Sequence, residues 1–128
     1  MDQQGQQVAV RVFRSDGDFI ALSASFFWFK FVVVGKPFLE LPRHLRNAVM
    51  SHEQGHVDLH HLEKGWLCLL VTPWLFFRLC RKQELEADAY AAQRGHASAL
   101  LELLRYDERE TYSHPSNAER RKHLKQYE

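Results

Sequence analysis

The sequence has little cysteine, no export signal and no long apolar run. Its 128 residues include two cysteines, too few for a disulfide scaffold, and their apolar surroundings predict that both lie in a buried helix. The first residues contain neither the basic nor the apolar region of a secretory signal. The longest run without charge, residues 65–77, has 13 residues, whereas a membrane-spanning helix needs about 20. We therefore expect a cytoplasmic protein without a transmembrane helix.

An excess of charge of one sign is also missing. The 17 lysines and arginines balance 16 aspartates and glutamates, which leaves a net charge of +1. Such a chain lacks the electrostatic field with which nucleic-acid-binding proteins attract their partners, so we expect no nucleic acid partner. Internal repeats and low-complexity linkers are absent too, and 45% of the residues are hydrophobic. Length and composition thus predict a single domain over residues 1–128 with one core.

The first third of the chain, residues 8–41, is rich in strand patterns. Valines alternate with other residues over positions 8–13, which predicts a half-buried strand, and Ser-Asp-Gly-Asp at 15–18 predicts a hairpin turn. We expect a second strand from Phe19, a third within residues 26–34 and a short fourth at 38–41.

Residues 42–127 have helical patterns. Proline is favourable at the first position of a helix, so we expect one helix from Pro42 to about Leu62 and another from Thr72-Pro73 to Gly95. A short helix is expected over residues 98–106, and a capping box at Ser116 predicts a last helix over 117–126. The predicted class is α+β, with a small antiparallel or mixed N-terminal sheet packed on the first two helices.

The most informative motif lies on the first predicted helix. His52 and His56 flank Glu53 in an HExxH pattern. Residues four apart on a helix lie about 40° apart around the axis and about 6 Å along it, so both imidazoles can hold one metal ion, and zinc suits them. Glu53 lies about 100° further round, where it can reach a water bound to that metal as a general base.

The second predicted helix offers a third ligand. Leu62 stands where a further histidine ligand would follow the motif, and His60 and His61 are rotated away from its row, so we expect the latter two to be helix-end residues. Glu84 and Asp88 lie four apart on one helix face. Glu84 can then bind zinc, and Asp88 can accept a hydrogen bond from the distal N–H of a ligand histidine. Two carboxylates on a solvated helix face are the alternative. Small Ala87 and Ala91 permit close helix packing, and Glu86 is expected to be solvated.

These residues resemble a known class of enzymes. The HExxH motif followed by Glu84–Ala91 is similar to the HExxH plus ExxAD pair of gluzincin metallopeptidases, in particular CAAX prenyl proteases, HtpX-type heat-shock proteases and BlaR-type antibiotic-sensor proteases. Residues 38–42 resemble the strand and Leu-Pro pair before the metal helix of the sensor proteases. His114-Pro115 with Arg120 resembles the HPxxxxR element of the CAAX and HtpX pattern.

The resemblance implies a minimal soluble gluzincin that hydrolyses peptide bonds of a peptide or protein substrate. It implies one Zn²⁺ per chain at His52, His56 and Glu84, and Glu53 as the base that activates the zinc-bound water. Asp88 would orient a ligand. His114 would contact the substrate or its oxyanion, unless it merely flanks the last helix, and the strand at 38–41 would lie near the cleft.

Three alternatives stay open. His52–His61, HEQGHVDLHH, is similar to the HEIGHxxLHH stretch of ImmA/IrrE-type peptidases, which cleave repressors. The same scaffold could also be a latent or inactive zinc-binding regulatory module, with the loop at residues 105–113 as a plug. Finally, Trp66–Phe77 could touch a membrane surface peripherally, with packing in the core as the competing interpretation.

Overall fold

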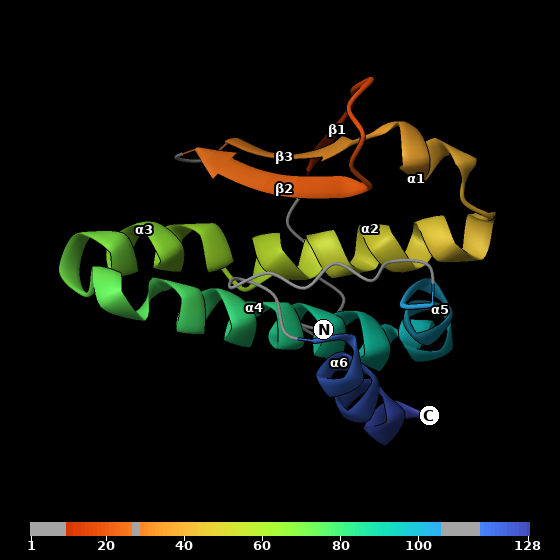
Figure 1. Cartoon of the computed structure of the whole chain (residues 1–128). Helices are drawn as coiled ribbons and strands as arrows, with labels where there is room; N and C mark the ends of the chain where they lie inside the picture. Colours follow the sequence, from red (N-terminus) through yellow and green to blue (C-terminus); the bar gives the residue numbers. More distant parts are fainter. Residues whose placement is uncertain (1–9, 27–28, 106–115) are drawn as a thin grey trace, which may run out of the picture.

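The strands form one mixed sheet in the part of the chain that the structure describes. The computed structural model describes residues 10–26, 29–105 and 116–128 (Figure 1). The strands are β1 (Arg11–Arg14), β2 (Ala21–Phe26) and β3 (Phe29–Val34). Their spatial order is β1-β3-β2, with β3 parallel to β1 and antiparallel to β2. β2 is therefore an edge strand of this sheet.

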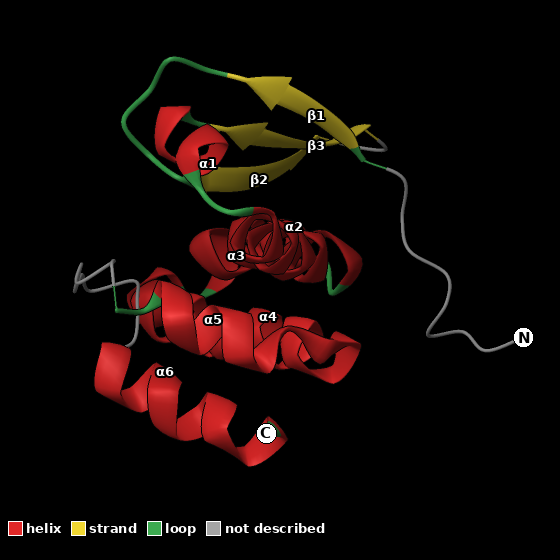
Figure 2. Cartoon of the chain, turned by 90° about the vertical axis from the view of Figure 1, so that its right-hand side faces the viewer, coloured by secondary structure: helices red, strands yellow, loops and turns green. Residues whose placement is uncertain are grey.

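The hairpin predicted at residues 15–18 is wrong. β1 and β2 do not pair, because β3 lies between them. The Ser15 N–H donates to the Val34 carbonyl, so this segment is attached to the end of β3. The predicted half-buried first strand is only partly right in its described part: Val10 is half-buried against the core, whereas all four residues of β1 are exposed. β1 is exposed because it lies at the sheet edge farthest from α2 (Figure 2). Residues 8 and 9 lie outside the described residues.

Residues 38–41, predicted as a strand, belong mostly to a helix. α1 spans Lys36–Glu40, and Pro37 lies in its first turn, where a proline costs no hydrogen bond. Phe38 turns into the core. At Gly35 an added Cβ would lie 1.9 Å from the Phe19 carbonyl oxygen, so only glycine allows this close approach. The chain leaves the sheet at Gly35 and goes directly into α1.

The first long helix ends earlier than predicted. α2 spans Arg43–Asp58, with Pro42 at its N-cap, and does not reach Leu62. His60 has a left-handed backbone with φ of 58°. Histidine is among the residues that adopt this conformation more often than most. The turn ends α2 and starts a separate helix, α3, over His61–Val71.

The second predicted helix and the C-terminal helices are confirmed. Gly95 has φ of 92° at the kink that ends the second one. The Ser116 hydroxyl accepts a hydrogen bond from the Glu119 N–H, as the capping pattern predicts. The elements are η2 (Pro73–Leu75), α4 (Phe76–Ala91), η3 (Ala92–His96), α5 (Ala97–Leu103), α6 (Asn117–Leu124) and η4 (Lys125–Tyr127).

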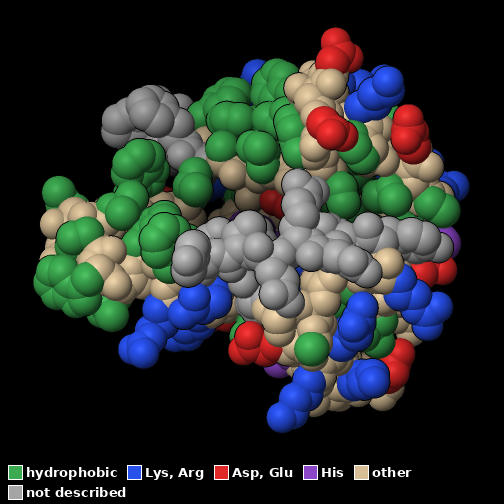
Figure 3. Space-filling model, in the orientation of Figure 1, with side chains coloured by type: hydrophobic (Ala, Val, Ile, Leu, Met, Phe, Trp, Pro, Cys, Tyr) green, Lys and Arg blue, Asp and Glu red, His purple; other side chains and the backbone are tan. Residues whose placement is uncertain are grey.

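The apolar stretch after α2 is exposed, which corrects the expectation of a buried helix and of core packing. Trp66 is 68% exposed, Leu70 82% and Trp74 76%, and the two cysteines are half-buried. Hydrophobic side chains cover this end of the molecule, around α3 (Figure 3). Among the described residues, no helix has the length and apolar character needed to cross a membrane.

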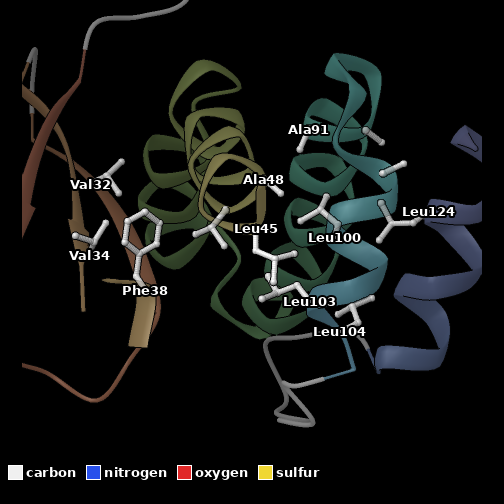
Figure 4. Close-up of a cluster of buried hydrophobic side chains, with 13 residues drawn as sticks. Val32, Val34, Phe38, Leu45, Ala48, Ala91, Leu100, Leu103, Leu104 and Leu124 are labelled. Atoms are coloured by element: carbon white, nitrogen blue, oxygen red, sulfur yellow. The ribbon is translucent and has the colours of Figure 1, made fainter. Parts of the chain in front are cut away.

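The core connects the layers of the molecule. The sheet, then α2 with α3, then α4 with α5, and finally α6 are stacked in that order (Figure 2). Buried apolar side chains from each layer form one cluster (Figure 4). It includes Val32, Val34, Leu45, Ala48, Ala91, Leu100 and Leu124. The predicted α+β class, with a small mixed sheet packed on the helices, is confirmed.

Candidate metal centre

Small residues let α2 and α4 approach closely at the HExxH motif. An added Cβ on Gly55 would lie 3.0 Å from the Cβ and Cγ atoms of Tyr90. Ala87 and Ala91 are fully buried, as their predicted role in helix packing requires. The Tyr90 hydroxyl donates to the Asp58 carboxylate, which ties the two helices together at the end of the motif.

Three side chains converge where these helices meet. The Nε2 atoms of His52 and His56 lie 3.2 Å apart. Each is 3.1 Å from an oxygen of Glu84. Ligands bound tetrahedrally to zinc at about 2.0–2.1 Å lie about 3.3 Å from one another, so the spacing fits one zinc ion. Two imidazoles and one carboxylate are also a donor set that catalytic zinc uses. The residues present therefore fit the metal that the motif predicts.

A carboxylate and a guanidinium hold the outer side of His52. His52 Nδ1 lies 2.8 Å from Asp88 Oδ1, and Asp88 is fully buried. Arg120 on α6 donates to both Asp88 oxygens, Nε to Oδ2 at 2.7 Å and Nη2 to Oδ1 at 2.8 Å. Sequence reasoning gave Arg120 no role beyond its place in the HPxxxxR pattern. Its contact joins α6 to the metal helix through one buried chain of polar groups.

The charges around the triad favour a cation. Burial alone would lower the pKa of His52, but Glu84 and Asp88 raise it to about 10. Burial alone would raise the pKa of Glu84, yet His52 and His56 hold it well below its usual range. In the same way Arg120 and His52 keep the pKa of Asp88 low against the effect of burial. Both carboxylates are thus ionised beside His52, an environment that suits a dication in place of a proton.

His61, predicted to be a helix-end residue, is instead part of this centre. It is 3% exposed, and its Nδ1 lies 2.8 Å from His56 Nδ1. Its Nε2 lies 3.3 Å from Glu86 Oε1, so Glu86 is not simply solvated as predicted. The buried Gln83 amide donates to the His61 carbonyl at 2.9 Å and fixes this turn. Burial, together with His56 and Lys64, lowers the pKa of His61 to about 3, so its ring is neutral.

No simple sequence signal predicts the position of His61. A helix continued through residue 62 rotates it away from His56, whereas the left-handed turn at His60 brings it back beside that ring. His60 itself is exposed, with its Nδ1 2.9 Å from Glu63. The adjacent His-His pair at the end of the motif was the only available hint.

A cleft of roughly 680 Å³ opens at the three converging side chains. Glu53, which is 8% exposed, lies in its wall beside the two histidines. Residues 19–23, which lead into and form the edge strand β2, line another wall. Residues 38–41, which were predicted to lie near the cleft, do not line it. His114 and residues 106–113 of the predicted plug lie outside the described residues.

Comparison with known proteins gives one family match, and it covers the second half of this centre. The model of peptidase family M48 matches residues 66–128, a stretch that includes Glu84, Asp88 and Arg120. No curated protein and no solved structure gives a match. The HExxH motif precedes the matched stretch, and the fold brings the two together at the donor triad. Over residues 66–128 the chain is thus similar to peptidase family M48, and the donor triad combines one residue of this stretch with two that precede it.

Proposed function

We propose that the protein is a zinc-dependent metalloendopeptidase of the gluzincin type, and that His52, His56 and Glu84 hold one zinc ion. The observation that carries the proposal is the triad that lines the cleft: the two Nε2 atoms lie 3.2 Å apart, and each lies 3.1 Å from one of the two carboxylate oxygens of Glu84. Bound zinc would polarise a peptide carbonyl and lower the pKa of a water molecule towards about 7. The family match at residues 66–128 supports the same function.

The side chains around the triad have separate roles in this proposal. Glu53 accepts a proton from the attacking water and delivers it to the leaving amine. Asp88 accepts the Nδ1 proton of His52, which leaves Nε2 of that ring free to bind metal. His61 does the same for His56, because a neutral His61 ring can accept the Nδ1 proton across 2.8 Å. Each metal histidine is thus held in the tautomer that ligation needs.

Within gluzincins, we favour the likeness to CAAX prenyl proteases and HtpX-type proteases. Arg120 is the arginine of the HPxxxxR pattern, and it binds the carboxylate that orients His52. The arginine of the HPxxxxR pattern thus binds the aspartate of ExxAD, and that aspartate contacts a histidine of HExxH. The three patterns are linked by direct contacts. The role of His114 as a substrate or oxyanion contact stays a prediction.

The test compares the parent protein with Glu53→Gln and Glu84→Ala. We expect Glu53→Gln to keep one zinc per chain and to lose cleavage of casein or an unfolded peptide library by about 100- to 10,000-fold. Glu84→Ala should lose most of its zinc. Glu40→Gln, a change at an exposed residue of α1, serves as the control for both measurements.

Two results would contradict the proposal. A Glu53→Gln variant that cleaves at the parent rate removes Glu53 from the reaction. A parent protein that binds zinc and folds, yet cleaves no substrate in the library, favours the regulatory zinc module instead.

A further inference from the structure

The end of the molecule formed by α3 and η2 has an apolar surface that the described residues do not cover. We call it the apolar tip. It consists of exposed side chains on α3, on η2 and at the start of α4: Trp66, Leu67, Leu69, Leu70, Val71, Trp74, Leu75 and Phe77. Two tryptophans and several leucines at such exposure, gathered at one end of the molecule (Figure 3), are typical of an interaction surface rather than of scattered apolar residues.

Basic residues border the apolar tip. Lys64, Arg78, Arg81 and Lys82 are all exposed, and residues 64–82 include no aspartate or glutamate. Three of these cations line a shallow groove of roughly 520 Å³ between α3 and α4, whose other walls are mainly apolar. Figure 3 shows lysine and arginine side chains gathered along one side of this hydrophobic end. The region therefore combines exposed tryptophans with positive charge.

We propose that the apolar tip docks on the surface of a membrane that contains anionic phospholipids. Tryptophan side chains are favoured at the boundary between headgroups and acyl chains, and neighbouring cations are attracted to anionic lipids. α3 has 11 residues and is about 16 Å long, whereas the apolar core of a bilayer is about 30 Å thick. The tip is thus suited to lie in the interface and not to span the membrane.

Positive charge argues against a second copy of this chain as the occupant. A symmetric dimer places the same patch of both copies face to face, which brings the four cations of one copy close to those of the other. An anionic lipid surface instead supplies the opposite charge along the whole border. The charge pattern therefore favours lipid over self-association.

Docking would also place the cleft beside the membrane. Trp66 and Leu69 belong to the apolar tip and also line the cleft that contains the triad. Under the proposed peptidase function, on which this step alone rests, substrates would be peptide segments that emerge at a membrane surface.

The test measures binding to vesicles by co-sedimentation and requires no enzymatic activity. We expect the full chain to bind vesicles containing about one third phosphatidylserine at least tenfold more tightly than vesicles of phosphatidylcholine alone, because anionic lipid attracts the basic border. The double variant Leu70→Ser/Trp74→Ser should bind at least tenfold less tightly. Arg78→Glu/Lys82→Glu should lose the preference for phosphatidylserine, and with it the weakening of binding by salt.

Val12→Ser/Phe13→Ser, which removes exposed apolar side chains from β1, is the matched control and should bind like the parent. Thermal unfolding of each variant shows that it is folded. Equal binding to both vesicle types, or parent-like binding by the Leu70→Ser/Trp74→Ser variant, would overturn the proposal. A parent dimer in sedimentation equilibrium that this variant converts to a monomer, without vesicle binding by the parent, would assign the tip to a second copy.

Discussion

Two regions of the molecule differ in what they bury. The junction of α2, α4 and α6 buries charged and polar groups, whereas the apolar tip exposes apolar side chains. At the junction Asp88 is fully buried, His52 is 8% exposed and Arg120 is half-buried, and each has a charged or hydrogen-bonding partner. At the tip Leu70 is 82% exposed and Trp74 is 76% exposed. Burying ions and exposing tryptophan both cost stability. Each region therefore fits the role proposed for it above: metal binding for the first, docking for the second.

The largest effect should follow from breaking the buried ion pair. Arg120→Ala leaves the fully buried Asp88 carboxylate without the two hydrogen bonds that Arg120 donates. Removing one partner of a buried pair costs about 3–5 kcal/mol, a large part of the stability of a small domain. Urea unfolding measures the loss. Lys122→Ala, at an exposed position of α6, should change the free energy of unfolding by less than about 0.5 kcal/mol. Equal midpoints for the two variants would show that the pair contributes no net stability.

The same chemical change in the core and at the tip should have very different effects. Leu45, 2% exposed, contacts the core cluster, and Leu45→Ala should destabilise the protein by about 2–5 kcal/mol. Leu70 is 82% exposed, so Leu70→Ala should change stability by less than about 0.5 kcal/mol. Unfolding of both variants without lipid measures the difference. A large loss for Leu70→Ala would mean that the tip is covered in solution.

A smaller effect is expected from the second histidine pair. His61→Leu removes the atom 2.8 Å from His56 Nδ1 and should weaken zinc binding by about 10- to 100-fold, as loss of such outer hydrogen bonds does. His61→Asn places an amide oxygen near the position of Nδ1 and should restore most of the affinity. Competition with a fluorescent chelator measures both values. If the leucine and asparagine variants bind zinc equally, His61 only fills space.

Local patterns predicted the parts of the centre that lie within one helix. The spacing of four residues placed His52 beside His56, and Glu84 and Asp88 on one face of α4, because helical geometry determines both relations. Ala87 and Ala91 likewise indicated where another helix could approach. The residues that begin helices were also recognisable from the local sequence: Pro42 and Ser116 are the N-cap residues of α2 and α6.

Relations between distant segments could not be predicted in this way. The parallel pairing of β1 with β3 and the contact of Arg120 with Asp88 join residues 20 or more positions apart, and no local pattern encodes either. The turn at His60 is a borderline case. Its left-handed backbone is supported by the Gln83 amide on α4, which holds the His61 carbonyl, so the helix break depends on tertiary packing.

The smallest effects are expected from the same substitution, glycine to alanine, in α2 and in α3. In Gly55→Ala the new Cβ would lie 3.0 Å from Tyr90, and such overpacking costs about 1–3 kcal/mol, only partly offset by a helix-propensity gain of up to about 1 kcal/mol. In Gly65→Ala the new Cβ meets Phe76 at 3.7 Å, an ordinary contact, so the gain of about 0.5–1 kcal/mol remains. We therefore expect the urea midpoint to shift in opposite directions. Gly55→Ala should lose about 1 kcal/mol of stability, and Gly65→Ala should gain a little. A gain in stability for Gly55→Ala would contradict the close contact of α2 with α4, on which the spacing of the donor triad depends.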